Sequence, residues 1–341
     1  MKADGTLQVL GIAVLAVTIA GTGPVRARRA ASAPLSAAVG QAACAEVPKR
    51  MTGAAIFKAQ VLLDRLDVSP GVIDGKPSGN FGKAIAAFQR VRGLPASGRL
   101  DRATWNKLCE NTGAPALIAY TVTDDDVRGP FIAEMPRDLE GMARLPALGY
   151  RSATQLLAEK FHTTEQMISG LNPGKAVDRA GTRIAVPNVS GERPAGQVAR
   201  IEVDKPAASV RALGRNGETI AFYPASVGSR EKPAPSGTYH VGRVVKDPTY
   251  HYDPKFRFKG VRTDRELTIA PGPNNPVGVV WIDLNKPTYG IHGTSHPEQI
   301  GNTGSHGCVR LTNWDALDLA GRVRKGTPVT FLDQTQTALS R

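Results

Sequence analysis

Apolar residues in the first third of the chain recur at the spacing of amphipathic helices. They fall at every third or fourth position over residues 54–66, and a second helical stretch covers residues 82–91. Asp101, a residue type that caps helix N-termini, precedes a third stretch that ends at Leu108. Loops rich in Gly, Pro and Asp separate these stretches, so the pattern predicts a small all-α three-helix bundle.

The next segment, residues 117–190, mixes strand and helix patterns. Helical stretches cover residues 156–161 and 164–171, and a strand is expected at each end of the segment, the second over residues 182–186. Residues 124–147 form a long insert in which we expect no regular element. The pattern predicts a small α+β module.

After a Gly- and Pro-rich linker at residues 191–197, the chain changes to short β-prone runs separated by Gly, Asn and Pro turns. Runs of this kind predict a mainly-β sandwich or partly closed barrel over residues 198–334. One late helix is expected over residues 313–323, with Thr312 as its N-cap and Asp315 in its first turn. The expected strands cover residues 198–203, 209–213, 219–227, 238–245 and 277–282.

An apolar run at residues 9–20 follows Lys2 near the N-terminus. It is short for a membrane span and has the length of a signal-peptide hydrophobic region, so we expect residues 1–27 to be a signal peptide. A retained N-terminal anchor is the alternative, and it would be the one link to a membrane. Residues 28–43 are rich in Ala, Ser and Arg and predict a flexible tether. Both alternatives export the rest of the chain to the periplasm or cell wall.

The formal net charge is +13, which favours anionic partners. Nucleic acid is disfavoured because the charge is spread along the chain, with 19 Lys and Arg against 13 Asp and Glu in residues 198–341. The sequence also has no basic helix, RNA-binding aromatic motif or Cys/His finger spacing. An anionic cell wall or membrane surface explains the charge equally well.

The chain has three cysteines, Cys44, Cys109 and Cys308. Because we expect an oxidising compartment, a disulfide between Cys44 and Cys109 is predicted, and it would close the three-helix domain at residues 44–112. Cys308 is then left as a free thiol. A buried, inert cysteine is the alternative for any lone thiol, so the surroundings of Cys308 decide its interpretation.

Five of the six histidines lie between positions 240 and 306, and three of them crowd around Cys308. A thiol is a useful nucleophile as the thiolate, which a neighbouring imidazole can generate and an adjacent cation can stabilise. Gly293, Gly304 and Gly307 allow a substrate to approach the backbone closely and present N–H groups to an oxyanion. This combination predicts nucleophilic catalysis by cysteine.

The two front segments resemble wall-binding modules. Residues 50–110 resemble the three-helix peptidoglycan-binding domain, and residues 117–190 resemble a LysM-like module. The first resemblance rests on Ser69-Pro70-Gly71-Val72-Ile73-Asp74-Gly75, Phe88-Gln89, Gly93-Leu94-Pro95 and Thr104-Trp105, and the second on Leu171-Asn172-Pro173-Gly174 and Ile184-Ala185-Val186-Pro187. We interpret the Asp-Gly and Phe-Gln elements as scaffold.

Every candidate catalytic residue follows the linker. We therefore expect that removing residues 50–190 weakens wall attachment and leaves chemistry on small soluble stem peptides of peptidoglycan intact.

Residues 198–333 resemble the L,D-transpeptidase catalytic domain. The resemblance rests on Tyr289-Gly290-Ile291-His292-Gly293-Thr294, Ile300-Gly301 and Ser305-His306-Gly307-Cys308-Val309-Arg310-Leu311. It implies that Cys308 is the nucleophile and that His292 is the general base, oriented by the backbone carbonyl of Gly293. No metal or organic cofactor is implied, since a thioester keeps the bond energy.

For several of the remaining motif residues more than one role is open. Gly307 and His306 are expected at the oxyanion or its loop, although a structural role for His306 is equally open. Arg310 suits either a stem carboxylate or the orientation of the loop. The other expected substrate-binding residues are Ser305, which also suits a loop hydrogen bond, Thr294 and Tyr289.

The implied reaction begins with attack by Cys308 on the carbonyl before D-Ala in a tetrapeptide stem. An amine of a second stem then resolves the thioester, and the expected partners are peptidoglycan stem peptides and glycan. A Cys/His carboxypeptidase or endopeptidase, in which water resolves the acyl-enzyme, is one alternative, and a non-catalytic wall-binding protein is another. A zinc site built from His292, His296, His306 and Cys308 is the third.

Overall fold

The computed structural model describes residues 1, 36, 37 and 39, and then 52–110, 114–189, 198–229, 232–256, 261, 263–305 and 307–333. The expected signal peptide and tether fall almost wholly outside these residues, as do Cys44 and His306. Every element below belongs to the compact unit Pro34–Arg341. In the part of the chain that is described, no helix has both the length and the apolar character needed to cross a membrane.

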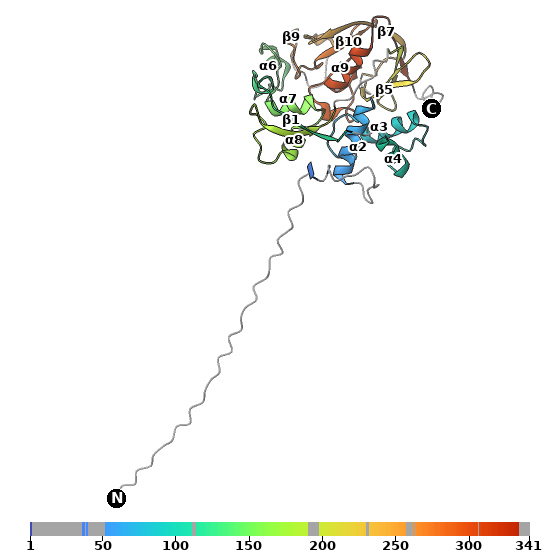
Figure 1. Ribbon diagram of the computed structural model, residues 1–341. Helices are drawn as coiled ribbons and strands as arrows, with labels where there is room; N and C mark the ends of the chain where they lie inside the picture. Colours follow the sequence, from blue (N-terminus) through green and yellow to red (C-terminus); the bar gives the residue numbers. More distant parts are fainter. Residues whose placement is uncertain are drawn as a thin grey trace. The chain divides into compact units, whose positions relative to one another are not determined.

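Three capped helices form the first part of this unit and confirm the predicted bundle (Figure 1): α2 (Gly53–Arg65), α3 (Gly79–Val91) and α4 (Arg102–Cys109). Asp101 caps α4 as expected and accepts a hydrogen bond from the Thr104 N–H. The helix α3 begins three residues before the predicted start, because Ser78 caps it by accepting from the Phe81 N–H.

Two buried glutamines hold the loops of the bundle. Gln60 Oε1 accepts from the N–H groups of Asp74 and Gly75, at 3.1 and 2.8 Å. Gln89 donates to Thr104 Oγ1 at 2.8 Å, and both glutamines are fully buried. Buried amides of this kind are satisfied within the protein. These contacts support the interpretation of the Asp-Gly and Phe-Gln elements as scaffold.

The structure records Cys109 as disulfide-bonded and Cys308 as free. Because Cys44 lies outside the described residues, the pairing of Cys44 with Cys109 stays a prediction.

Replacing Cys44 and Cys109 together by serine should lower the free energy of unfolding by about 4 kcal/mol, since the cross-link restricts the unfolded chain. Urea denaturation of the exported protein in a Cys308→Ala background measures this loss without thiol exchange by the nucleophile. Peptide mapping without reductant should recover the Cys44–Cys109 pair. Finding all three thiols free in exported protein would contradict the prediction.

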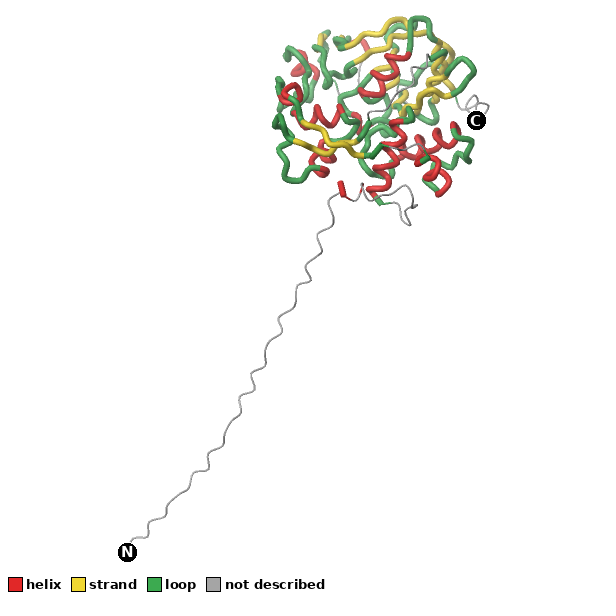
Figure 2. The backbone as a smooth tube through the Cα atoms, viewed as in Figure 1, coloured by secondary structure: helices red, strands yellow, loops and turns green. Residues whose placement is uncertain are grey.

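The middle segment contains a two-stranded antiparallel sheet, with Leu117 opposite Pro187, and four helices. The insert expected to be irregular holds two of these helices, which begin at side-chain caps from Thr123 and Asp138 that the apolar pattern does not reveal. Figure 2 distinguishes these short helices from the surrounding loops. The elements are β1 (Leu117–Thr121), α5 (Asp124–Val127), α6 (Leu139–Ala143), α7 (Ala153–Lys160), α8 (Glu165–Leu171) and β2 (Arg183–Pro187).

The last part is built on a nine-stranded sheet with the order β5-β4-β3-β13-β7-β10-β11-β12-β6. Its two outermost strands, β5 and β6, are joined in the chain by Ala225 alone. The sheet must therefore curl until its edges nearly meet, which confirms the predicted partly closed barrel. The strands are β3 (Arg200–Asp204), β4 (Ser209–Leu213), β5 (Thr219–Pro224), β6 (Ser226–Val227), β7 (Gly237–Lys246), β10 (Val280–Leu284), β11 (Gly290–His292), β12 (Val309–Arg310) and β13 (Pro328–Leu332).

Some strand predictions need correction. The run expected at residues 277–282 forms a strand only from Val280, because Asn275 turns the preceding backbone by accepting from the Val277 N–H. The run at residues 219–227 is divided at Ala225 between the two edges. The pattern also does not reveal β11, β12 and β13, nor the separate hairpin of β8 (Tyr250–Tyr252) and β9 (Leu267–Ile269), nor the 3-10 turns η1 (Pro254–Phe256) and η2 (Pro297–Gln299).

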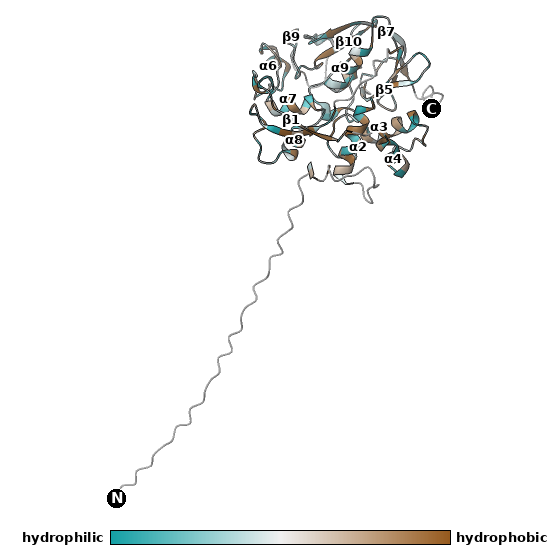
Figure 3. Cartoon of the chain, viewed as in Figure 1, coloured by the Kyte–Doolittle hydropathy of each residue, from teal (hydrophilic) through white to brown (hydrophobic). Residues whose placement is uncertain are grey.

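The late helix α9 (Asn313–Arg322) is confirmed, and Thr312 caps it by accepting from the Asp315 N–H. Its apolar face packs into the core of the sheet through Ala316 and Leu319, both fully buried. The hydropathy of these segments can be followed in Figure 3.

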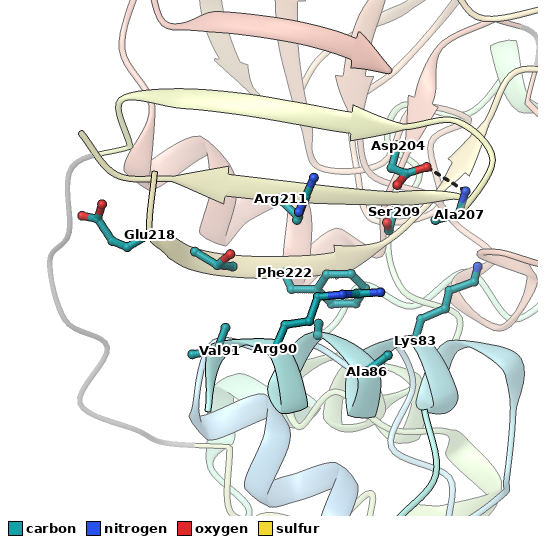
Figure 4. Close-up of a pocket in the computed structure, with 12 residues that line it drawn as sticks. Lys83, Ala86, Arg90, Val91, Asp204, Ala207, Ser209, Arg211, Glu218 and Phe222 are labelled. Atoms are coloured by element: carbon teal, nitrogen blue, oxygen red, sulfur yellow. Dashed lines mark hydrogen bonds between the residues drawn. The ribbon is translucent and has the colours of Figure 1, made fainter. Parts of the chain in front are cut away.

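The helical bundle packs against the edge of the sheet. Phe222 of β5 belongs to the buried core of the bundle, and Figure 4 shows it between α3 and the neighbouring strands. Its N–H donates to Asp67 O and its carbonyl accepts from the Ser69 N–H, each at 2.9 Å. The side chain of the same Asp67 forms an ion pair at 2.6 Å with Arg322 of α9, which also pairs with Asp318 at 3.0 Å. The bundle is therefore joined to the sheet by backbone, apolar and ionic contacts.

The middle segment packs against the bundle and the last part of the chain. Its Leu157 and Phe161 share a buried cluster with Phe57 of α2. The imidazole of His162 stacks on the indole of Trp314 with ring centroids 5.2 Å apart. These contacts bring α7 next to the N-terminus of α9.

Candidate active site

Two short parallel strands position the candidate nucleophile and base. In their register Ile291 lies beside Val309 and His292 beside Arg310. Ile291 and Val309 are fully buried in the sheet core, so the alternate residues His292 and Cys308 point to the opposite face. The preceding pair in this register is Gly290 and Cys308. His292 lies two residues further along its strand, so the Cα atoms of Cys308 and His292 are roughly 8 Å apart. Both side chains can then reach one reacting atom.

This face opens into a cavity of about 920 Å³. Five residues that the sequence singles out line it: Tyr289, His292, Ser305, Cys308 and Arg310. A cavity of this size accommodates a peptide stem rather than a single small ion. The structure thus brings the two motifs, which are separate in the sequence, to one site.

His292 is held in one orientation. Its Nδ1 lies 2.7 Å from the carbonyl oxygen of Gly293, and because that oxygen can only accept, Nδ1 carries the proton. The lone pair is then on Nε2, as a general base requires. Trp281, directly opposite on β10, stacks on the ring with centroids 5.3 Å apart. Burial lowers the pKa of His292 to about 4, so the imidazole is neutral at neutral pH.

The thiol of Cys308 is also neutral at rest. Burial raises the pKa of Cys308, and this effect outweighs the opposing influence of Gly290 and of the Arg310 cation. Its Sγ lies 3.5 Å from the carbonyl oxygen of Thr288, a donor geometry that needs the protonated thiol. The pair is therefore a thiol beside an imidazole, and the proton has to move as the substrate reacts.

Alkylation of Cys308 by iodoacetamide should reflect this state. We expect the rate to rise with pH through a midpoint above that of N-acetylcysteine, measured in parallel, because the buried thiol resists ionisation. A Cys308→Ala variant gives the background rate. A pH-independent plateau below neutral pH would instead indicate a preformed thiolate–imidazolium pair and contradict the prediction.

The loop before the nucleophile is stabilised by Ser305 and Arg310. Ser305 is buried, and its hydroxyl accepts from the Gly228 N–H at 2.6 Å and donates to the Cys308 carbonyl. Arg310 Nη2 donates to the Gly304 carbonyl, while its buried Nε has no partner among the described residues. Gly307 has a φ of +102°, which favours glycine at this bend.

Thr294 and His296 are not among the residues that line the cavity. Thr294, predicted to touch substrate, is buried at 4% exposure, and its N–H donates to Asn313 Oδ1 at 3.0 Å. His296, part of the zinc alternative, has a side chain that is 63% exposed, with Nδ1 3.5 Å from Glu298. Within the described residues, from which His306 is missing, no group of three His, Cys, Asp or Glu is placed to hold a metal ion.

Sequence reasoning did not single out several residues of the cavity. Trp281 lies on a predicted strand, but only the strand register shows that it faces His292. Lys232 and Arg243 add positive charge to the lining, and Leu139 reaches it from the insert of the middle segment. Burial and the nearby Cys308 raise the pKa of Tyr250, another lining residue, to about 12.

Comparison with known proteins finds matches for two parts of the chain. Residues 198–331 match the L,D-transpeptidase catalytic domain, and residues 52–108 match a peptidoglycan binding domain. The L,D-transpeptidase relative named YkuD in Bacillus licheniformis is 32% identical over 177 residues, which cover 51% of this chain and 90% of that protein. The chain belongs to the L,D-transpeptidase family. A second relative of the family, YbiS of Escherichia coli, is 33% identical over 119 residues, or 34% of this chain and 39% of that protein.

Among solved structures, the catalytic domain of the Enterococcus faecium L,D-transpeptidase is 23% identical, with a TM-score of 0.31, and the match covers 39% of this chain and 96% of that domain. The L,D-transpeptidase 1 of Mycobacterium tuberculosis is 19% identical, with a TM-score of 0.29, over 44% of this chain and 66% of that chain.

Proposed function

We propose that this member of the L,D-transpeptidase family cross-links peptidoglycan through a thioester on Cys308, with His292 as the proton carrier. The observation that supports it most is the fixed imidazole: the Gly293 carbonyl holds the proton on Nδ1 and leaves Nε2 as a base on the face that carries the only free thiol of the described residues. A cysteine nucleophile next to an oriented base is the arrangement that acyl transfer requires.

In the first half-reaction, Sγ of Cys308 bonds to the carbonyl carbon before D-Ala while its proton passes to Nε2 of His292. The carbon–nitrogen bond then breaks, and the proton on His292 goes to the departing amine of D-Ala. In the second half-reaction an amine of another stem attacks the thioester and gives a proton to His292. The new amide forms, and the sulfur leaves and takes a proton back from His292. Atoms and protons balance, and the bond energy stays in the thioester.

The charges of the cavity suit an anionic stem peptide. Arg310, Lys232 and Arg243 all line it. An arginine can bind a carboxylate through two parallel hydrogen bonds. The buried Nε–H of Arg310 has no partner among the described residues and can donate one of them. We assign Arg310 to a stem carboxylate on this basis.

The front of the chain is assigned to wall attachment. Residues 52–108 match a peptidoglycan binding domain, and the net charge of +13 suits an anionic wall. Export of the chain, through the apolar run at residues 9–20, is part of the same proposal because the substrate lies outside the cytoplasm. The LysM-like assignment of residues 117–190 remains part of this proposal.

A hydrolase that acts on the same stems is the alternative, because water and an amine compete for one thioester. Purified protein is incubated with tetrapeptide muropeptides, and the products are identified by mass spectrometry, with and without an added amine acceptor. Dimers that lack one D-Ala support cross-linking, whereas tripeptides alone show a hydrolase. If neither product forms, the non-catalytic alternative is supported.

A further inference from the structure

The side chain of Asn313, the first residue of α9, uses its full hydrogen-bonding capacity near the base. Its Oδ1 accepts from the N–H groups of Thr294 and Val279, at 3.0 and 3.3 Å. Its Nδ2 donates to Glu159 Oε2 at 3.0 Å and to Pro273 O at 3.2 Å. Two donors face the oxygen and two acceptors face the nitrogen, so only one orientation of the amide satisfies all four. Asn313 is 1% exposed, and its amide is therefore fixed.

The backbone group that Asn313 holds is the one that orients His292. The Thr294 N–H and the Gly293 carbonyl belong to the same planar peptide group, so a bond to the N–H also fixes the direction of the carbonyl. That carbonyl accepts from Nδ1 of His292 at 2.7 Å. A Cβ at Gly293 would collide with the Asn313 amide oxygen, so glycine is needed for this close approach.

Glu159 connects this arrangement to the middle segment. It lies on α7, 154 positions before Asn313, outside the region that matches the catalytic domain. Its Oε1 accepts from the hydroxyl of Tyr150 at 3.1 Å, so both carboxyl oxygens have partners. Burial raises the pKa of Glu159 to about 7, although the bonds from Asn313 and Tyr150 oppose this rise. The carboxyl group is thus shielded from water, and its Oε2 is held against the Asn313 amide.

We propose that Glu159 is a positioning residue for His292: it fixes the Asn313 amide, which in turn holds the Gly293 carbonyl that orients the base. The middle segment then takes part in the chemistry and does more than attach the enzyme to the wall. This proposal rests on the proposed role of His292. It also replaces the expectation that removing residues 50–190 leaves chemistry on soluble stems intact, since that deletion removes Glu159.

The test uses the full chain with Glu159→Ala, Glu159→Leu, Glu159→Gln and a control, Gln155→Ala. Gln155 lies one helical turn earlier on α7 and exchanges hydrogen bonds with Asn274 across the same contact, at 3.0 and 3.2 Å. Gln155→Ala therefore removes a contact between the middle segment and the last part of the chain. It does not remove a hydrogen bond of the Asn313 amide, which holds the peptide group beside His292. The acylation rate with a carbapenem-type β-lactam is followed by intact mass, folding by circular dichroism, and the His292 tautomer by ¹⁵N NMR.

Glu159→Ala and Glu159→Leu should acylate about ten- to a hundredfold more slowly than wild type, the value of one charge-assisted hydrogen bond. Their His292 should also lose its preference for the Nδ1–H tautomer, which a merely structural role would not change. Glu159→Gln, which retains an acceptor for Asn313, should recover most of the rate, and Gln155→Ala should match wild type. Glu159→Leu keeps a side chain of similar volume. It allows the acylation rate and the tautomer to be measured if the alanine variant does not fold.

The proposal is overturned if folded Glu159→Leu acylates within about twofold of Gln155→Ala, or if the His292 tautomer is the same in both. A wild-type chain that is not acylated at all would contradict the proposed function, and the tautomer comparison would still decide the role of Glu159.

Discussion

Cys308→Ala is expected to abolish acyl-enzyme formation, and Cys308→Ser to retain little of it, because a hydroxyl is far harder to deprotonate than a thiol by a base with a lowered pKa. His292→Ala should slow acylation by about 10²–10⁴-fold, the contribution of a positioned proton-transfer group. The measurement is intact mass after incubation with a tetrapeptide stem or a carbapenem-type β-lactam. All variants are compared at equal folded fraction.

His306→Ala is the matched control for His292→Ala. We expect a smaller effect, at most about 10²–10³-fold, because its predicted role is to support the oxyanion or the loop. His306 lies outside the described residues, so this expectation rests on the sequence motif. If His306→Ala is inactive while His292→Ala acylates at nearly the wild-type rate, the base is the residue two positions before the nucleophile.

Arg322→Ala is expected to lower the free energy of unfolding by about 3–5 kcal/mol, because it leaves two buried carboxylates without their shared cation. The side chains of Arg322, Asp67 and Asp318 are only 8%, 5% and 12% exposed. Urea denaturation of the full chain measures the loss.

Arg151→Ala is the control for this substitution. Its ion pair with Glu165 is 2.6 Å long, but the two side chains are 48% and 40% exposed, so its removal should cost less than about 1 kcal/mol. Equal losses for Arg322→Ala and Arg151→Ala would contradict the expectation. A large loss confined to Arg322→Ala is the expected result, because its ion pairs are buried and that of Arg151 is exposed.

The local parts of the fold were predictable because their signals are local. Asp101 and Thr312 mark helix starts, since a side-chain cap acts within three residues. By contrast β11 and β12 have three and two residues, and strands this short leave no alternation to detect. Their sequences contain glycine and polar residues because they carry the site.

The candidate site was predictable where a motif keeps its residues together. The Gly293 carbonyl lies beside Nδ1 of His292 as expected, because the two groups are adjacent in the chain. The buried position of Thr294 and the contact of Glu159 with Asn313 depend on how the chain packs. A partner 154 positions away leaves no periodicity or spacing in the sequence, so no local pattern predicts it.

The contact at Phe222 has a consequence for solubility. An outer strand with unpaired N–H and C=O groups is a template for edge-to-edge addition of another chain, which starts aggregation. Here the Asp67 carbonyl and the Ser69 N–H form hydrogen bonds with both backbone groups of Phe222. The loop after α2 therefore covers the edge of β5 at this position. The contact therefore protects this edge of the sheet from pairing with another chain while the protein folds. A fragment that begins at residue 198 would expose this edge and should self-associate.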